Sequence, residues 1–241
     1  MRRVAAGAAC ALACLGLAAC ESTQDKNARL AKGGASPFKE KGLTVTRENR
    51  DVKVGRTTIL SDENGTAAVV EVENRSKRTL ANVPLAIDVS DAKGRSVFKN
   101  DAPGLEPSLT TVAALRPGEK LAWVDDQVQP VGTPKEVKAQ AGISKGSAPA
   151  KLPEIEISQP NLENDPTSGV NASGFVTNRS KLTQLKFTLF AVALKGNRVV
   201  AAGRGAVARL KPGKRTAFHI FFIGDPRGAR LTIAAPPTTL E

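Results

Sequence analysis

The stretch Val72-Glu73-Asn74-Arg75-Ser76-Lys77 recurs later in the chain as Val176-Thr177-Asn178-Arg179-Ser180-Lys181. Allowing a two-residue deletion just after the second occurrence aligns the strands that follow. The aligned pairs are Leu80 with Leu182, Val83 with Leu185, Leu85 with Phe187, Ile87 with Leu189 and Gly94 with Gly196.

A second motif follows each of these stretches. Leu115-Arg116-Pro117-Gly118 matches Leu210-Lys211-Pro212-Gly213, and an aromatic residue comes five positions after each glycine, Trp123 in one case and Phe218 in the other. Matching motifs in the same order predict an internal duplication. The first copy carries an extra loop rich in Pro and Gly, residues 101–108.

Each repeated motif has a structural interpretation. The Asn suits an Asx-turn or a left-handed residue where a strand ends. The Pro-Gly pair starts a turn, because Pro fixes φ and Gly accepts a positive φ. Apolar residues over 80–89 recur largely at every second position, which is typical of a strand with one face toward a core.

The whole chain after residue 40 favours strands over helices. Asn64-Gly65 and Gly196-Asn197 are two-residue hairpin turn signals. The sequence therefore predicts an all-β fold made of two tandem β-sandwich domains. The expected strands include residues 66–73, 80–89, 120–128, 185–194, 199–210 and 216–223.

At these motifs the chain resembles the FxLYD family of bacterial Ig-like domains. The second copy fits best through Gly174-Phe175-Val176-Thr177-Asn178, Phe187-Thr188-Leu189-Phe190-Ala191, Gly196, Leu210-Lys211-Pro212-Gly213 and Phe218. Phe190-Ala191 departs from the family's Tyr-Asp. The first copy is looser, with Leu85-Ala86-Ile87-Asp88-Val89 in that place. The resemblance implies Ig-like sandwiches and assigns no activity.

The N-terminus reads as a targeting signal. Arg2 and Arg3 precede an uncharged run over residues 4–19, which is short for a membrane span. The run ends Leu17-Ala18-Ala19-Cys20, which resembles the lipobox of bacterial lipoproteins. We expect lipid on the Cys20 thiol and cleavage before it, although an ordinary secretory signal is the alternative. Two acyl chains suffice for stable anchoring.

The expected organisation follows from these boundaries. Residues 1–19 are a signal peptide, 20–40 a lipidated tether, 41–143 the first sandwich, 144–153 a linker, and 154–241 the second, FxLYD-like sandwich. The linker contains Ser144-Lys145-Gly146-Ser147-Ala148-Pro149, a composition typical of loops.

Positive charge is concentrated late in the chain. The formal net charge is +12, yet residues 166–241 hold twelve basic residues and only two acids, Asp225 and Glu241. Such a surface favours contact with anionic partners, although a solvated sandwich face is the alternative. The candidate contacts with an anionic surface are Lys186, Lys195, Arg198, Arg204, Arg209, Lys211, Lys214 and Arg215.

The residues that could carry chemistry are few. The chain has one His, one Trp and no Tyr. We interpret His219 as a strand-edge or half-buried structural residue, and Trp123 as a core residue because it matches Phe218. Asp88, Asp91, Asp125 and Asp126 lack calcium-loop spacing and read as solvated turn carboxylates. We expect no metal, no cofactor and no catalytic residue.

The sequence therefore predicts a non-enzymatic, extracytoplasmic protein anchored to the bacterial membrane by lipid. Its modules would bind or space a protein or an anionic envelope polymer. An accessory subunit of an envelope transporter or of a secreted enzyme complex is the alternative. Nucleic acid is not an expected partner, because no recognition motif is present.

Overall fold

A computed structural model describes residues 42–144, 148–165 and 169–241. The predicted signal peptide and tether, including Leu17, Ala18, Ala19 and Cys20, lie outside the described residues, as does part of the predicted linker. From residue 41 onward the chain forms one compact unit.

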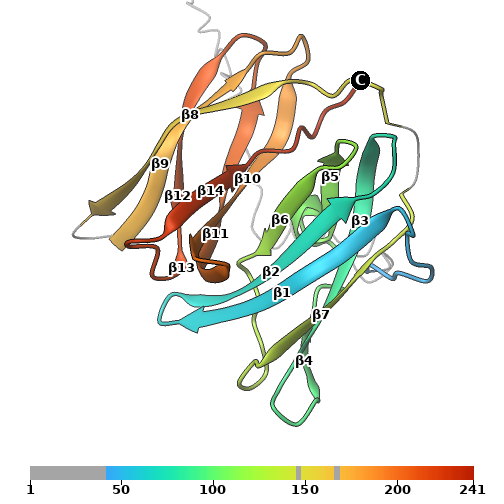
Figure 1. The fold of residues 1–241 in the computed structure, drawn as a ribbon, viewed down its shortest axis with the longest axis vertical. Coiled ribbons are helices and arrows are strands. Elements are labelled where there is room, and N and C mark those ends of the chain that lie inside the picture. The colour runs from blue at the N-terminus through green and yellow to red at the C-terminus, as the bar shows by residue number, and fades with distance from the viewer. Residues whose placement is uncertain (1–41, 145–147, 166–168) are drawn as a thin grey trace, which may run out of the picture. The chain divides into compact units, whose positions relative to one another are not determined.

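The described residues are almost entirely β, which confirms the all-β prediction (Figure 1). The strands of the first copy are β1 (Val52–Asp62), β2 (Gly65–Asn74), β3 (Leu80–Ser90), β4 (Ser96–Lys99), β5 (Thr111–Leu115), β6 (Lys120–Asp125) and β7 (Glu136–Ala141). A 3-10 turn, η2 (Pro107–Leu109), precedes β5.

The strands of the second copy are β8 (Ile155–Asp165), β9 (Gly169–Asn178), β10 (Gln184–Lys195), β11 (Arg198–Leu210), β12 (Arg215–Phe221), β13 (Ile223–Gly224) and β14 (Arg230–Ala234). All the pairings between strands are antiparallel, and each joins strands of the same copy.

The two copies have equivalent sheets. One sheet has the order β1-β2-β6 in the first copy and β8-β9-β12 in the second. The other is centred on β3, which pairs with β4, β5 and β7, or on β10, which pairs with β11 and β14. The first hairpin of each copy, β1–β2 or β8–β9, contains a register shift.

The duplicated asparagines confirm the repeat and show its purpose. Asn74 and Asn178 are fully buried. Each side-chain amide donates to a carbonyl four residues on and to the leucine carbonyl of the Leu-x-Pro-Gly turn. Each Oδ1 accepts the backbone N–H two residues later, which is an Asx-turn. The asparagine therefore ties the end of one strand to the turn between two others.

The register predicted for the next strand is wrong by two residues. Leu80 pairs with Leu115, and its counterpart opposite Leu210 is Gln184 rather than Leu182. The following hairpin is one residue shorter in the second copy, because five residues separate the paired Ser90 and Ser96 and four separate Leu194 and Val199. Because side chains alternate with a period of two, a shift of two leaves the apolar pattern intact, and the sequence pattern cannot detect it.

The extra loop of the first copy is confirmed and interrupts a strand. Strand β11 runs unbroken along β10, whereas the first copy has β4 and β5 separated by residues 100–110, here called the insertion loop. Asn100, which is 1% exposed, bridges the gap. Its side chain accepts from the Ile87 N–H and donates to the carbonyls of Leu85 and Leu109, in place of the missing strand pairs.

Two hydrophobic clusters form the core. One lies within the second copy and centres on Phe187, Leu189 and Phe218. The other is built around Trp123 in the first copy but includes second-copy residues, namely Phe190, Val192, Val199, Ala202 and Ile223. Each strand pairing stays on one side of the predicted boundary at 144–153, whereas apolar packing joins residues from both sides. The division into two separate domains stays a prediction.

Candidate functional site

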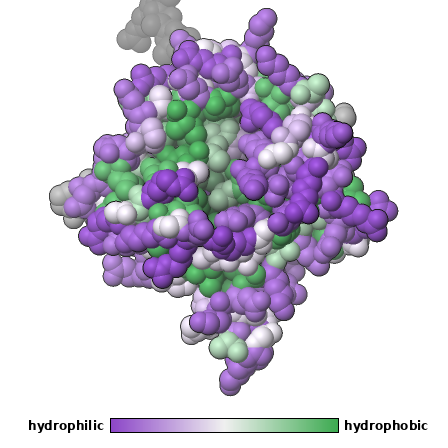
Figure 2. All heavy atoms as spheres, viewed as in Figure 1, coloured by the Kyte–Doolittle hydropathy of each residue, from purple (hydrophilic) through white to green (hydrophobic). Residues whose placement is uncertain are grey.

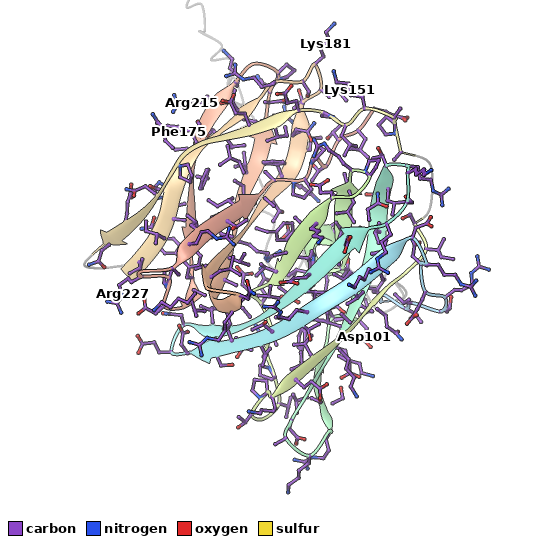
Figure 3. All side chains as sticks on the ribbon, viewed as in Figure 1. Asp101, Lys151, Phe175, Lys181, Arg215 and Arg227 are labelled. Atoms are coloured by element: carbon purple, nitrogen blue, oxygen red, sulfur yellow. The ribbon has the colours of Figure 1, made fainter. Side chains whose placement is uncertain are left out.

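The basic residues of the second copy gather at opposite ends of its strands. Lys195 and Arg198 flank the β10–β11 hairpin, whereas Arg209, Lys211, Lys214 and Arg215 lie around the β11–β12 turn. Strand β10 separates the ends by roughly 36 Å at the usual rise per residue. In Figure 3, Lys181 and Arg215 lie at one end and Arg227 at the other.

We call Lys181, Lys211, Lys214 and Arg215 the basic turn surface. All four are exposed. The turn is built as predicted, with Gly213 at φ +67° and its N–H donating to the Asn178 carbonyl. Among the described residues, Lys181, Lys211 and Lys214 form no ion pair within 4.0 Å. Their ammonium groups are therefore open to an external anion.

The matching turn of the first copy includes an acidic residue. Glu119 occupies the position of Lys214, and its carboxylate accepts the Arg116 N–H at 2.6 Å and lies 3.7 Å from the Arg116 guanidinium. Arg78 nearby pairs with Asp51 at 2.8 Å. At the four matched positions the first copy holds Lys77, Arg116, Glu119 and Lys120, a net charge of +2, whereas the second copy holds four bases, a net charge of +4.

Arg215 is held in place by two contacts. Its guanidinium carbon lies 3.7 Å from the centroid of the Phe175 ring, and a terminal nitrogen donates to Gln159 at 3.0 Å. Figure 3 shows Arg215 and Phe175 together at the same end as Lys181. Cation–π stacking fixes the side chain without neutralising its charge.

Arg204 corrects the predicted set of anionic-surface contacts, because its side chain is only 7% exposed. Its Nε donates to Asp126 at 2.7 Å, its backbone N–H donates to the other carboxylate oxygen, and Nη1 donates to Ser108 Oγ at 2.8 Å. The Arg204 guanidinium therefore bonds residues of the first copy and is not available to an external anion.

Two further contacts join the copies. The Gly224 N–H donates to the Asp62 carboxylate at 2.7 Å, and the Arg56 guanidinium donates to the Asn197 carbonyl. The Asp62 contact joins the end of the β1–β2 hairpin to β13, and the Arg56 contact joins the register shift of β1 to the β10–β11 turn. Lys195 and Arg198 lie beside this contact and are exposed.

The four aspartates do not form a cation site. Asp88 and Asp91 pair with Lys99 and Arg95, and a hydrogen bond from Arg95 lowers the pKa of Asp91. The reading of Asp125 as a solvated carboxylate is wrong, since it is 1% exposed and burial raises its pKa to about 6. Across the described residues, no three His, Cys, Asp or Glu side chains are placed to hold a metal ion.

The two rare side chains have structural positions. Trp123 is fully buried opposite Val70, and its indole N–H donates to the Ser108 carbonyl at 2.9 Å, which confirms its core role. His219 lies on β12 at the edge of its sheet, as expected, opposite Ser173. It is exposed rather than half-buried.

Apolar side chains reach the surface of the second copy. Figure 2 shows them gathered on one face. The partly buried residues around the second core include Ile155, Ile157, Leu162, Leu231 and Ile233, from β8 and β14. Each of these two strands is the edge of its sheet. Within the described part of the chain, no helix is long and apolar enough to span a bilayer.

Comparison with known proteins adds no relative: no family model matches the chain, and no curated protein matches it. The resemblance to FxLYD domains rests on the motifs alone.

Proposed function

We propose that this protein is a lipid-anchored, extracytoplasmic, non-enzymatic binding module whose basic turn surface contacts an anionic envelope polymer. One observation supports this most directly. The turn carries Glu119, which pairs with Arg116, in the first copy and Lys214 in the second, so the second copy lacks the acid and its matched positions carry +4 instead of +2. Asn178, Pro212 and Gly213 shape this turn, and the side chains of Lys181, Lys211 and Lys214 form no ion pair among the described residues.

The location in this proposal comes from the N-terminal sequence. Leu17-Ala18-Ala19-Cys20 supplies the acylation signal, and residues 20–40 would connect the lipid to the folded part. Cys20→Ala should release the protein from the membrane fraction into the soluble fraction. Membrane retention of this variant would contradict lipid anchoring, whatever the outcome of the binding tests.

Polymer binding is tested by exchanging charge at the matched turns. We would measure co-sedimentation of the full chain carrying Cys20→Ala with isolated cell wall and with phosphatidylglycerol vesicles. Lys181→Glu, Lys211→Glu and Lys214→Glu together should weaken binding at least 100-fold, since each base near an anionic surface contributes about 1 kcal/mol. Raising the salt concentration should also weaken binding of the unsubstituted protein.

The matched control reverses charge on the first copy. Lys77→Glu, Arg116→Glu and Lys120→Glu change the net charge by the same amount at the equivalent end. Equal weakening by the two triple variants would mean that net charge alone drives binding and would contradict a specific basic turn surface. Wall binding without vesicle binding would identify the polymer rather than the lipid headgroup.

A protein partner in an envelope complex is the second candidate. It is favoured by the apolar residues that β8 and β14 leave partly exposed (Figure 2). Replacing Ile157 and Ile233 by Ser should then abolish a specific co-purifying protein, whereas the triple Glu variant of the basic turn surface should retain it. A pull-down that returns only wall polymer would exclude this candidate.

A further inference from the structure

Three basic side chains meet at an open hollow of about 470 Å³ between the two copies, here called the basic hollow. Strand β1 lines it from the first copy, and the β10–β11 hairpin lines it from the second. None of the lining residues is acidic, and the three bases are exposed, so a ligand from solution can reach them. The lining residues are Arg56, Thr58, Lys195, Asn197, Arg198 and Val199.

The hairpin brings its two bases directly together. Lys195 and Arg198 are partners in the antiparallel pairing of β10 with β11, on either side of the Gly196-Asn197 turn. Partners in such a pair have Cβ atoms about 5 Å apart, and like charges placed there are destabilising. A bound anion would offset this repulsion.

The third base comes from the first copy and is held against the same turn. Arg56 lies at the register shift of β1, and its guanidinium donates to the Asn197 carbonyl. A carbonyl does not neutralise the charge, and a guanidinium has five N–H donors, so most of them remain for a ligand. Bases of both copies therefore converge on one hollow.

These charges are not balanced by neighbouring acids. Among the described residues, none of the three bases forms an ion pair within 4.0 Å. Asp225 feels the charge of Lys195, but its carboxylate is bonded to Arg227 at 2.8 Å. In the matching hairpin of the first copy, Arg95 pairs with Asp91 at 2.7 Å. The second copy has no such pair at its hairpin.

From this arrangement we infer that the basic hollow binds a compact anion with two or more negative charges, of the phosphate class. Guanidinium groups match the oxygens of phosphate in a bidentate geometry, and an ammonium group adds a point charge. A singly charged carboxylate would leave most of the positive charge unbalanced. The inference goes beyond the proposed function, because the hollow lies at the opposite end of β10 from the basic turn surface.

Inorganic pyrophosphate is the probe for this site. The protein is the full chain carrying Cys20→Ala together with Lys181→Glu, Lys211→Glu and Lys214→Glu, so that the basic turn surface does not contribute. NMR titration at low salt should shift the backbone amide signals of Gly196 and Asn197 with a Kd of about 1 mM, which a few charge-assisted hydrogen bonds can support. Acetate at the same ionic strength should bind at least about tenfold more weakly.

Two substitutions test whether both copies contribute to the site. Arg56→Gln in the first copy and Arg198→Gln in the second should each weaken pyrophosphate binding about fivefold or more, because each removes one charged contact. Arg198→Gln keeps the inference testable where Arg56→Gln disturbs the contact between the copies. The matched control is Lys53→Gln with Arg209→Gln, which removes one exposed base from β1 and one from β11 outside the hollow. It should leave the affinity unchanged.

Vesicles distinguish a soluble phosphate compound from a lipid headgroup. Binding to phosphatidic acid vesicles that is lost when Arg56→Gln and Arg198→Gln are combined would assign the phosphate to a headgroup. Pyrophosphate binding without vesicle binding would assign it to a soluble compound. Absence of pyrophosphate binding, equal affinity for acetate, or equal weakening by the control pair would each overturn the inference. None of these results would bear on polymer binding by the basic turn surface, which is measured separately with that surface intact.

Discussion

The two copies share one frame and differ in what interrupts it. In the second copy, β11 runs unbroken beside β10 from Arg198 to Leu210. In the first, the equivalent strand is cut by the insertion loop, which Asn100 and Trp123 hold in place. The buried asparagine and the Leu-x-Pro-Gly turn are common to both. The shared residues thus specify the sandwich, whereas the differing ones specify the junction and the charge.

The first prediction concerns what the copies share. Asn74→Ala and Asn178→Ala should each lower the free energy of unfolding by about 3–5 kcal/mol, because each substitution leaves several buried backbone groups without partners. Urea denaturation should be followed by Trp123 fluorescence, which reports the first copy, and by circular dichroism, which reports both. A loss below about 1 kcal/mol in either variant would contradict a structural role for the asparagine.

The second prediction concerns the join between the copies. Arg204→Met leaves Asp126 without its ion partner and should cost about 3 kcal/mol. We expect the fluorescence and circular dichroism transitions, coincident in the unsubstituted protein, to separate. The control is Arg227→Met, which breaks the exposed pair with Asp225 and should cost less than about 0.5 kcal/mol. Coincident transitions in Arg204→Met would show that apolar packing alone couples the copies.

The third prediction concerns pH. Burial raises the pKa of Asp125 from 3.8 to about 6, so the folded state holds a proton that the unfolded state releases. This proton stabilises the fold below pH 4, and its contribution of about 2–3 kcal/mol is lost as the pH rises through 6. Asp125→Asn should remove that dependence between pH 4 and 6.5.

Asp225→Asn is the matched control for the pH measurement. Its hydrogen bonds with Arg227 lower the pKa of Asp225 to about 2, so any contribution is lost only as the pH falls toward 2. The window between pH 4 and 6.5 should therefore be unchanged in this variant. An unaltered slope in Asp125→Asn would mean that another group titrates there.

The smallest effect concerns the basic turn surface. Arg215→Ala removes the stacking on Phe175 and should cost about 0.5–1 kcal/mol of stability. Lys214→Ala at the adjacent position should be neutral in thermal denaturation. Equal destabilisation by the two substitutions would mean that the Phe175 contact contributes nothing measurable.

Local sequence chemistry was sufficient for much of this fold. Asn74, Asn178 and the Pro-Gly turns were interpretable because turn geometry depends on the residues that form it. Trp123 followed from its alignment with Phe218. The register of β10 could not be predicted, because alternation cannot show whether Leu182 or Gln184 is equivalent to Leu80 in the other copy.

The residues of the candidate site also differ in whether the sequence could place them. Exposed lysines at a turn could be placed from sequence, since turns lie at the surface. Arg204 could not, because its position depends on Asp126 and on Ser108 of the insertion loop, which lie far away in sequence. A count of charges cannot tell a buried base from an exposed one, and only the packing shows that Arg204 is buried and Lys214 is exposed.

The apolar cluster shared across residues 144–153 determines how this protein can be divided. Phe190, Val192 and Ile223 pack with first-copy residues around Trp123, so cleavage at this segment followed by separation would expose them to water on one side and leave Asp126 bare on the other. We therefore expect neither piece to be stable on its own. A protease that cuts at residues 144–153 should give a nicked protein whose two pieces stay associated until a denaturant separates them.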